Sequence, residues 1–199
     1  YWGSGPLRPI DQTGLSIYAS RGRQYMFGNQ DSTVAGDAAG DEVMSRQALQ
    51  HFVSPDDVLF ASNLGTRDRA LRFIADKAVE LGVATDADEL FEAFVRREGD
   101  GATGMLEGFA IPHAKSPSVS AASVLVLKDE QGVSGWGTMD GLPVHIAIAL
   151  LIPEKPVDTA HLMVLSKVAE ALMDDRFRAD LLSADGAAQL AGIINARLL

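Results

Sequence analysis

The sequence predicts an α/β fold in which helices flank both faces of a mixed β-sheet. Two runs, 122–127 and 144–152, are almost continuously apolar and rich in Val, Ile and Leu, which is typical of strands buried on both sides. From Val58 onward, strand and helix patterns follow one another in the order β, α, α, β, β, β, α, α, α. This alternation favours a layered α/β domain with a mixed sheet.

A short strand and a helix open the domain. Residues 58–60 are apolar and precede a glycine-containing turn at 63–65. Apolar residues recur at helical spacing between 66 and 81, and Gly82 follows as a stop signal. The sequence therefore predicts a helix over 66–81.

A second helix and a glycine-rich loop come next. Asp86, with a glutamate three residues later, resembles a capping box and predicts a helix that ends near Arg97. Glycines punctuate the loop 98–108, which leads into an apolar piece at 109–111. His113 therefore lies at the end of a predicted strand, where α/β proteins commonly place their sites.

The C-terminal part supplies the remaining elements. Asp140 and Gly141 mark a turn between the two long apolar strands. A helix is predicted to begin near Thr159, and two further helical stretches carry apolar residues at 177–181 and 190–194.

Residues 1–52 are predicted to form an N-terminal extension or linker, and the domain is placed at 53–199. Seven glycines lie between Tyr1 and Glu42, and no apolar periodicity persists there. Two short pieces, 15–18 and 24–27, have the composition of strands that could pair.

Composition excludes several classes of function. The formal charge is 17 − 27 = −10 and no Lys/Arg-rich run is present, which argues against nucleic acid as a partner. The absence of cysteine excludes disulfides, thiolate metal sites and cysteine nucleophiles. The longest mostly apolar run, 144–152, is far shorter than the roughly 20 residues that cross a bilayer. No secretory signal pattern opens the chain, so we expect a cytoplasmic location.

The four histidines differ in their surroundings. His145 lies inside an apolar strand pattern and His51 in the boundary segment, so both are interpreted as structural. His113 follows a rigid proline and a glycine-rich loop, which allows close backbone approach to a bound group. His161 lies in the first turn of its predicted helix, where backbone N–H groups favour anions. The last two are the candidate functional residues.

Several short motifs of the sequence resemble those of one known family. Arg97-Glu98, Ala102-Thr103-Gly104 and the run 108–113 are similar to the segment around the phosphorylated histidine of enzyme IIA (EIIA) domains, mannitol/fructose type, of the sugar phosphotransferase system (PTS). Arg97 stands 16 positions before His113, as 113 − 97 gives. Further residues look like the rest of that domain: Val133, Trp136, the run 140–144, Pro153, and His161-Leu162 leading into Leu165 and Ala169. The resemblance covers about 58–199 and implies the EIIA fold of that type.

The resemblance implies that His113 accepts a phosphoryl group and that Arg97 and His161 flank it. A neutral imidazole nitrogen is nucleophilic at physiological pH, and its phosphoramidate keeps a high transfer potential. Arg97 offers a planar charged fork for the equatorial oxygens of the transferred group. His161 is expected to donate a hydrogen bond to a phosphoryl oxygen.

The resemblance also implies the partners. The phosphoryl donor is expected to be the phosphocarrier protein HPr, and the acceptor an EIIB domain, which uses a cysteine in this family. The membrane EIIC transporter would be reached only through EIIB, for sugar uptake and phosphorylation. Neither a cofactor nor a metal is implied, because arginine and backbone N–H groups supply the electrostatics. The identity of the sugar is not predicted.

Three residues depart from the commonest family pattern. Ala102 stands where many members have serine, and Phe109 where isoleucine or valine is usual. Glu107 adds a negative charge beside the expected site, and we expect it to slow or tune transfer.

Two alternatives stay open. A regulatory phosphorelay module of the nitrogen type, or one linked to a transcription regulator, would use the same histidine to switch a partner protein. A zinc hydrolase would use His113, His145 and His161, but their spacings of 32 and 16 residues match no helix or turn pattern of metal ligands.

Overall fold

The computed structural model describes residues 18–20, 23–25, 52–155 and 160–198. The chain divides into two compact units, 1–48 and 49–199. In the first unit, β1 (Tyr18–Ser20) and β2 (Arg23–Tyr25) pair antiparallel. These strands overlap the two pieces predicted to pair, and the rest of those pieces lies outside the described residues.

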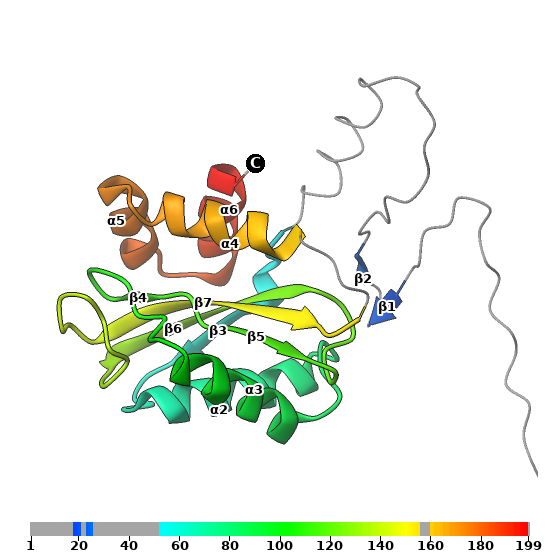
Figure 1. The fold of residues 1–199 in the computed structure, drawn as a ribbon. Helices are drawn as coiled ribbons and strands as arrows, with labels where there is room; N and C mark the ends of the chain where they lie inside the picture. Colours follow the sequence, from blue (N-terminus) through cyan, green and yellow to red (C-terminus); the bar gives the residue numbers. More distant parts are fainter. Residues whose placement is uncertain (1–17, 21–22, 26–51, 156–159, 199) are drawn as a thin grey trace, which may run out of the picture. The chain divides into compact units, whose positions relative to one another are not determined.

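The second unit holds the α/β domain (Figure 1). Its elements are, in chain order, a 3-10 turn η1 (Pro55–Asp57), β3 (Val58–Ala61), α2 (Arg67–Glu80), α3 (Ala87–Gly99), β4 (Phe109–Ala110), β5 (His113–Ser116), β6 (Ser123–Val133), β7 (Val144–Pro153), α4 (Ala160–Ala171), α5 (Asp175–Ser183) and α6 (Ala187–Leu198).

The five strands form a mixed sheet. β3 pairs parallel with β6, and β6 pairs antiparallel with β7. β4 and β5 both pair parallel with β7 and follow one another along it. The edge strand beside β7 is therefore built from two short pieces, and the second of them begins at His113.

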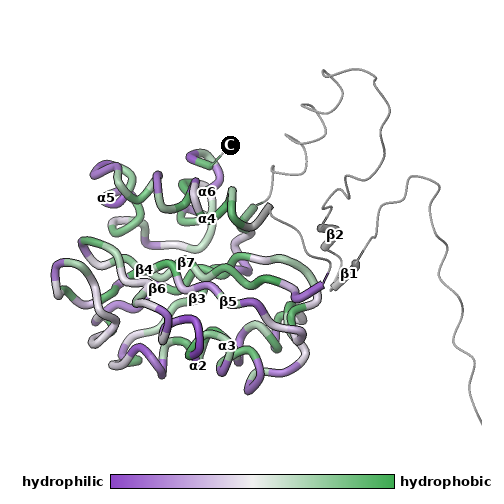
Figure 2. Tube along the Cα trace, in the orientation of Figure 1, coloured by the Kyte–Doolittle hydropathy of each residue, from purple (hydrophilic) through white to green (hydrophobic). Residues whose placement is uncertain are grey.

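Helices cover both faces of this sheet, with α2 and α3 on one side and α4, α5 and α6 on the other (Figure 1). Side chains of β6 alternate between two cores: Leu125 and Leu127 pack in the core with α2 and α3, whereas Val124 and Val126 pack in the core with α4, α5 and α6. Such two-sided burial explains the nearly continuous apolar sequence of the central strands, which Figure 2 shows in green. The predicted fold class is confirmed.

Helix boundaries follow the capping residues. Asp86 accepts the N–H of Glu89 at the start of α3, as the sequence predicted, and Thr66 accepts the N–H of Arg69 at the start of α2. α3 continues to Gly99, slightly beyond the predicted end, so Arg97 lies in its last turn. No helix in the described ranges is both long and apolar enough to cross a membrane.

Two strand predictions were incomplete. The sequence placed His113 after a strand, but it opens β5, because Pro112 interrupts the pairing only locally: the N–H of Leu150 donates to the Pro112 carbonyl, at 2.9 Å. β6 also runs on to Val133 through a polar stretch with a register shift. That stretch is held by the buried carboxylate of Asp129, which accepts four backbone N–H groups.

Candidate functional site

Arg97 and His113 meet at the edge of the sheet. His113, partly buried at the start of β5, lies beside the last turn of α3. The Nε of Arg97 is 2.8 Å from Nε2 of His113, and Nη1 of Arg97 donates to the Gly101 carbonyl at 2.9 Å. The structure thus brings together two of the three predicted site residues.

The hydrogen bonds of His113 define the state of its ring. Nδ1 is 2.9 Å from the carbonyl oxygen of Ile111. A carbonyl oxygen only accepts, so Nδ1 must carry the hydrogen. In the neutral imidazole, Nε2 then holds the lone pair, and this lone pair faces the N–H of Arg97.

The local backbone explains why Ile111 is available to His113. Ile111 lies between β4 and β5 on the strand at the sheet edge, so its backbone groups are free to serve residues other than β7. Its N–H donates to the carbonyl of Thr103 at 3.0 Å, and its carbonyl accepts from His113. The loop that follows α3 therefore pairs with the open edge of the segment that carries the histidine.

This loop is anchored by a buried polar cluster. The Glu98 carboxylate accepts the N–H and the hydroxyl of Thr103, and the indole N–H of Trp136 donates to the same hydroxyl. In the sequence, Glu98, Thr103 and Trp136 stand out only as parts of the motifs that resemble the family. The available signal was a glutamate directly beside Arg97, but no local pattern shows which groups it would bind.

Close backbone approach holds the loop against the segment after β6. A Cβ at Gly104 would lie 2.9 Å from both Cα and N of Thr138. Gly137, with a φ of 73°, would place a Cβ 2.9 Å from that of Ala102. Glycine is required at Gly104 because the opposing atoms are backbone atoms that cannot turn aside, and at Gly137 because its φ is positive and a Cβ there would overlap the Cβ of Ala102.

Glu107 has a different environment from the one expected. Its side chain forms an ion pair at 2.8 Å with Arg178, a buried residue of α5 that also donates to the Leu172 carbonyl and to Asp175. Hydrogen bonding to Glu107 is the main cause that raises the pKa of the Arg178 guanidinium. The charge expected to act on the site is thus engaged by an arginine 71 residues away in sequence.

The other histidines are placed as follows. His161 is the second residue of α4, in its first turn as predicted, and its side chain lies outside the described atoms. His145 is the second residue of β7, with its ring against Gly132 and Gly108, and its Nδ1 lies 3.3 Å from the Asp129 carbonyl, an environment that fits a structural role. His51 lies outside the described residues. Among described side chains, no group of three or more His, Asp or Glu residues is arranged to hold a metal.

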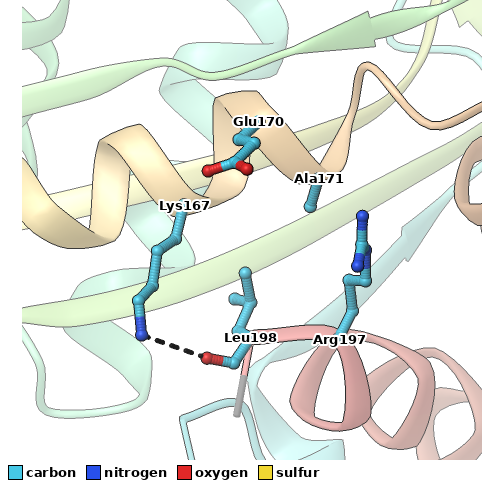
Figure 3. A pocket seen from close by; sticks show the side chains of 5 residues that line it. All are labelled: Lys167, Glu170, Ala171, Arg197 and Leu198. Atoms are coloured by element: carbon cyan, nitrogen blue, oxygen red, sulfur yellow. Dashed lines mark hydrogen bonds between the residues drawn. The ribbon is translucent and has the colours of Figure 1, made fainter.

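A separate open pocket lies between α4 and α6, lined by Lys167, Glu170, Ala171, Arg197 and Leu198 (Figure 3). Lys167 donates to the Leu198 carbonyl at 3.5 Å, and Arg197 pairs with Asp174 at 3.4 Å. The pocket shares no residue with the Arg97–His113 site.

Comparison with known proteins gives the family. Residues 51–197 match the family described as "Phosphoenolpyruvate-dependent sugar phosphotransferase system, EIIA 2". A fructose-specific EIIA component from Haloferax volcanii is 33% identical over 120 residues, 60% of this chain and 77% of that protein. A nitrogen regulatory protein from Bradyrhizobium diazoefficiens is 32% identical over 126 residues, 63% of this chain and 80% of that protein.

Other similar proteins differ more in length or sequence. The 2-O-alpha-mannosyl-D-glycerate-specific EIIABC component of Escherichia coli is 28% identical over 74% of this chain, which spans only 22% of that protein. The crystal structure of nitrogen regulatory protein IIA-Ntr from Neisseria meningitidis matches with a TM-score of 0.64 and 27% identity, covering 76% of this chain and 99% of that one. Escherichia coli mannitol IIA, solved in complex with phosphorylated mannitol IIB, has the same fold, with a TM-score of 0.60, 17% identity and coverage of 72% and 97%.

The match over 51–197 covers well over half of the sequence, and the sheet and helix layers agree with solved members of the family. The chain belongs to the EIIA type-2 family of the phosphoenolpyruvate-dependent sugar phosphotransferase system.

Proposed function

We propose that this chain is a phosphoryl carrier in which Nε2 of His113 accepts the phosphoryl group of phospho-HPr and passes it to an EIIB domain. The observation that carries the proposal is the pair of hydrogen bonds on the His113 ring. Nδ1–H is bound to the Ile111 carbonyl, and the Nε2 lone pair is directed to an arginine. A nucleophilic nitrogen and a group that stabilises phosphoryl oxygens thus already lie together.

The transfer step needs no additional reactant. The Nε2 lone pair attacks phosphorus as the bond between phosphorus and the donor's histidine nitrogen breaks, and that nitrogen regains its lone pair. The hydrogen stays on Nδ1 and remains hydrogen-bonded to the Ile111 carbonyl throughout, and this bond stabilises the positive charge that develops on the ring. The reverse sequence hands the group onward to the acceptor.

Arg97 is proposed to change partner during transfer. Before reaction its Nε–H points at the Nε2 lone pair, the place that phosphorus will occupy. As the new bond forms, the guanidinium moves aside and donates to the equatorial oxygens, where the negative charge lies. Its bond to the Gly101 carbonyl keeps the group close to the site.

His161 is proposed as the third member of the site. Its position in the first turn of α4 places it near N–H groups that have no partner within the helix. An imidazole there would donate one more hydrogen bond to the phosphoryl group.

A regulatory role of the nitrogen type is the second candidate. It is favoured by the two nitrogen regulatory relatives above, of which this chain covers 80% and 99%. Both roles use the same histidine, and a cytoplasmic location suits both. Only the destination of the phosphoryl group separates them.

The test is reconstitution with phosphoenolpyruvate, enzyme I and HPr, followed by mass spectrometry under conditions that preserve phosphohistidine. We expect one phosphoryl group per chain, located on His113. His113→Ala should remain folded, because the side chain is only partly buried, and should accept none. Full labelling of His113→Ala would refute the assignment.

A second assay separates the two roles. The phosphorylated protein is mixed with purified EIIB domains of fructose and mannitol transporters, and loss of label is followed by rapid quench. Transfer within seconds supports sugar transport. Label that stays on this chain with every EIIB offered favours the regulatory role.

A further inference from the structure

Glu98 is a buried carboxylate beside Arg97 that the proposed transfer step does not use. Only 5% of the residue is exposed. Its Oε2 accepts the N–H of Thr103 at 3.1 Å, and its Oε1 accepts the Thr103 hydroxyl. A buried charge is costly unless its oxygens are bonded, and here both oxygens are committed to one residue of the site loop.

Trp136 completes the cluster from the other side. Its indole N–H donates to the Thr103 hydroxyl at 3.2 Å. The hydroxyl therefore has a fixed direction, since it donates to Glu98 and accepts from Trp136. Thr103 and Trp136 are 7% and 2% exposed, so water does not compete freely for these bonds.

The cluster is linked to His113 through two backbone bonds. The Thr103 carbonyl accepts the N–H of Ile111 at 3.0 Å, and the Ile111 carbonyl accepts Nδ1–H of His113 at 2.9 Å. The same loop offers the Gly101 carbonyl to Arg97. His113 and Arg97 thus each donate a hydrogen bond to a backbone carbonyl, of Ile111 and of Gly101, in the part of the backbone that Glu98 holds in place.

We propose that Glu98, Thr103 and Trp136 are positioning residues that hold His113 in its Nδ1–H tautomer and keep Arg97 directed at Nε2. The physical step is the orientation of the Ile111 peptide group. With Thr103 fixed, the Ile111 carbonyl points at Nδ1 and the hydrogen stays there. With Thr103 released, the ring also populates the Nε2–H tautomer, which has no lone pair at the reacting nitrogen.

The kinetic part of this inference rests on the proposed function, whereas the tautomer itself does not. Thr103→Val keeps the shape of the side chain and removes the hydroxyl, and Thr103→Ser restores the hydroxyl without the methyl group. Asn195→Ala is the control for general loss of stability, because Asn195 lies on α6, away from the loop, and its side chain makes two hydrogen bonds to the backbone of Val53.

The first measurement is the ¹⁵N spectrum of the His113 ring in the unphosphorylated protein. We expect the Nδ1–H tautomer in wild type, in Thr103→Ser and in Asn195→Ala, and a mixture in Thr103→Val. The second measurement is single-turnover transfer from phospho-HPr. Thr103→Val should lower the saturating rate by about tenfold, the effect of one lost buried hydrogen bond, with the half-saturating HPr concentration unchanged.

The outcomes are separable. The proposal would be overturned if Thr103→Val kept both the wild-type tautomer of His113 and the wild-type transfer rate, whether or not its melting temperature fell. If Thr103→Val does not fold, Glu98→Gln decides by the same spectrum, since its amide cannot accept both Thr103 bonds in the same way. If wild type accepts no phosphoryl group, the proposed function fails, and the tautomer comparison still tests the positioning role.

Discussion

Gly104→Ala tests the close contact between the site loop and the segment after β6. A Cβ at this position would lie 2.9 Å from Cα and N of Thr138 and 3.0 Å from the carbonyl carbon of Gly137. Ordinary carbon contacts lie near 3.5–4.0 Å. All three opposing atoms are backbone, so the overlap is relieved only by moving one of the two segments.

The expected cost follows from this overlap. Inserting a methyl group into a well-packed region destabilises by about 1–3 kcal/mol. In a unit of this size each kcal/mol lowers the melting temperature by about 3 °C. The displacement also moves Thr103, so transfer to His113 should slow together with the loss of stability.

Gly192→Ala provides the matched control. Gly192 lies within α6 with no atom within 4 Å of a Cβ built on it. Alanine there should stabilise by about 0.5–1 kcal/mol, because it restricts the unfolded chain and favours helix. Thermal and urea unfolding of both variants measure the difference. A Gly104→Ala protein that melts at or above wild type would refute the close packing of the loop.

Three further predictions concern charge and the third site residue. Arg178→Met should lower the free energy of urea unfolding by about 2–3 kcal/mol, because it leaves the buried Leu172 carbonyl without this donor. Glu107→Gln should lower it by under about 1 kcal/mol, since that side chain is largely exposed. Equal losses in the two variants would contradict this reasoning. Backbone N–H bonds from Glu107 and Leu142 lower the pKa of Asp140. The stabilisation by Asp140 is therefore present above its unfolded pKa and is lost as the pH falls through the lower folded pKa. Asp140→Asn should flatten the acid side of the profile of melting temperature against pH, and an unchanged profile would count against this role. His161→Ala should transfer more slowly than His161→Gln, which keeps an N–H donor, and equal rapid-quench rates in both variants and wild type would leave His161 with a structural role only.

Burial determines which parts of the fold could be predicted. The strands β6 and β7 and the helices α2 and α3 bury continuous or periodic apolar residues, and such patterns are visible in the sequence alone. β5 has four residues with Lys115 exposed between two buried neighbours, which is too short a pattern to identify a strand. The pairing order of the strands cannot be predicted from such patterns either, because parallel partners such as β3 and β6 are far apart in the sequence and meet only in the folded structure.

The features of the site also divide into those that the sequence predicts and those that depend on the folded structure. Arg97 and His113 stand in motifs that resemble the family, and the structure brings their side chains within 2.8 Å of each other. The pairing of Glu107 with Arg178 spans 71 residues and follows no local pattern. The state of the His113 ring depends on which backbone carbonyl lies beside it, and no sequence signal specifies that contact.

The sheet edge explains why these features occur together. An edge strand leaves outward backbone groups without partners, which proteins must cover or satisfy. Here the outward N–H of Ile111 is taken by the loop after α3, and its outward carbonyl by the His113 ring. Pro112 has no N–H to give to β7, so the strand is interrupted just before the histidine, yet its carbonyl still binds Leu150. The same unpaired edge that would otherwise favour aggregation therefore supplies the acceptor that leaves Nε2 of His113 with its lone pair.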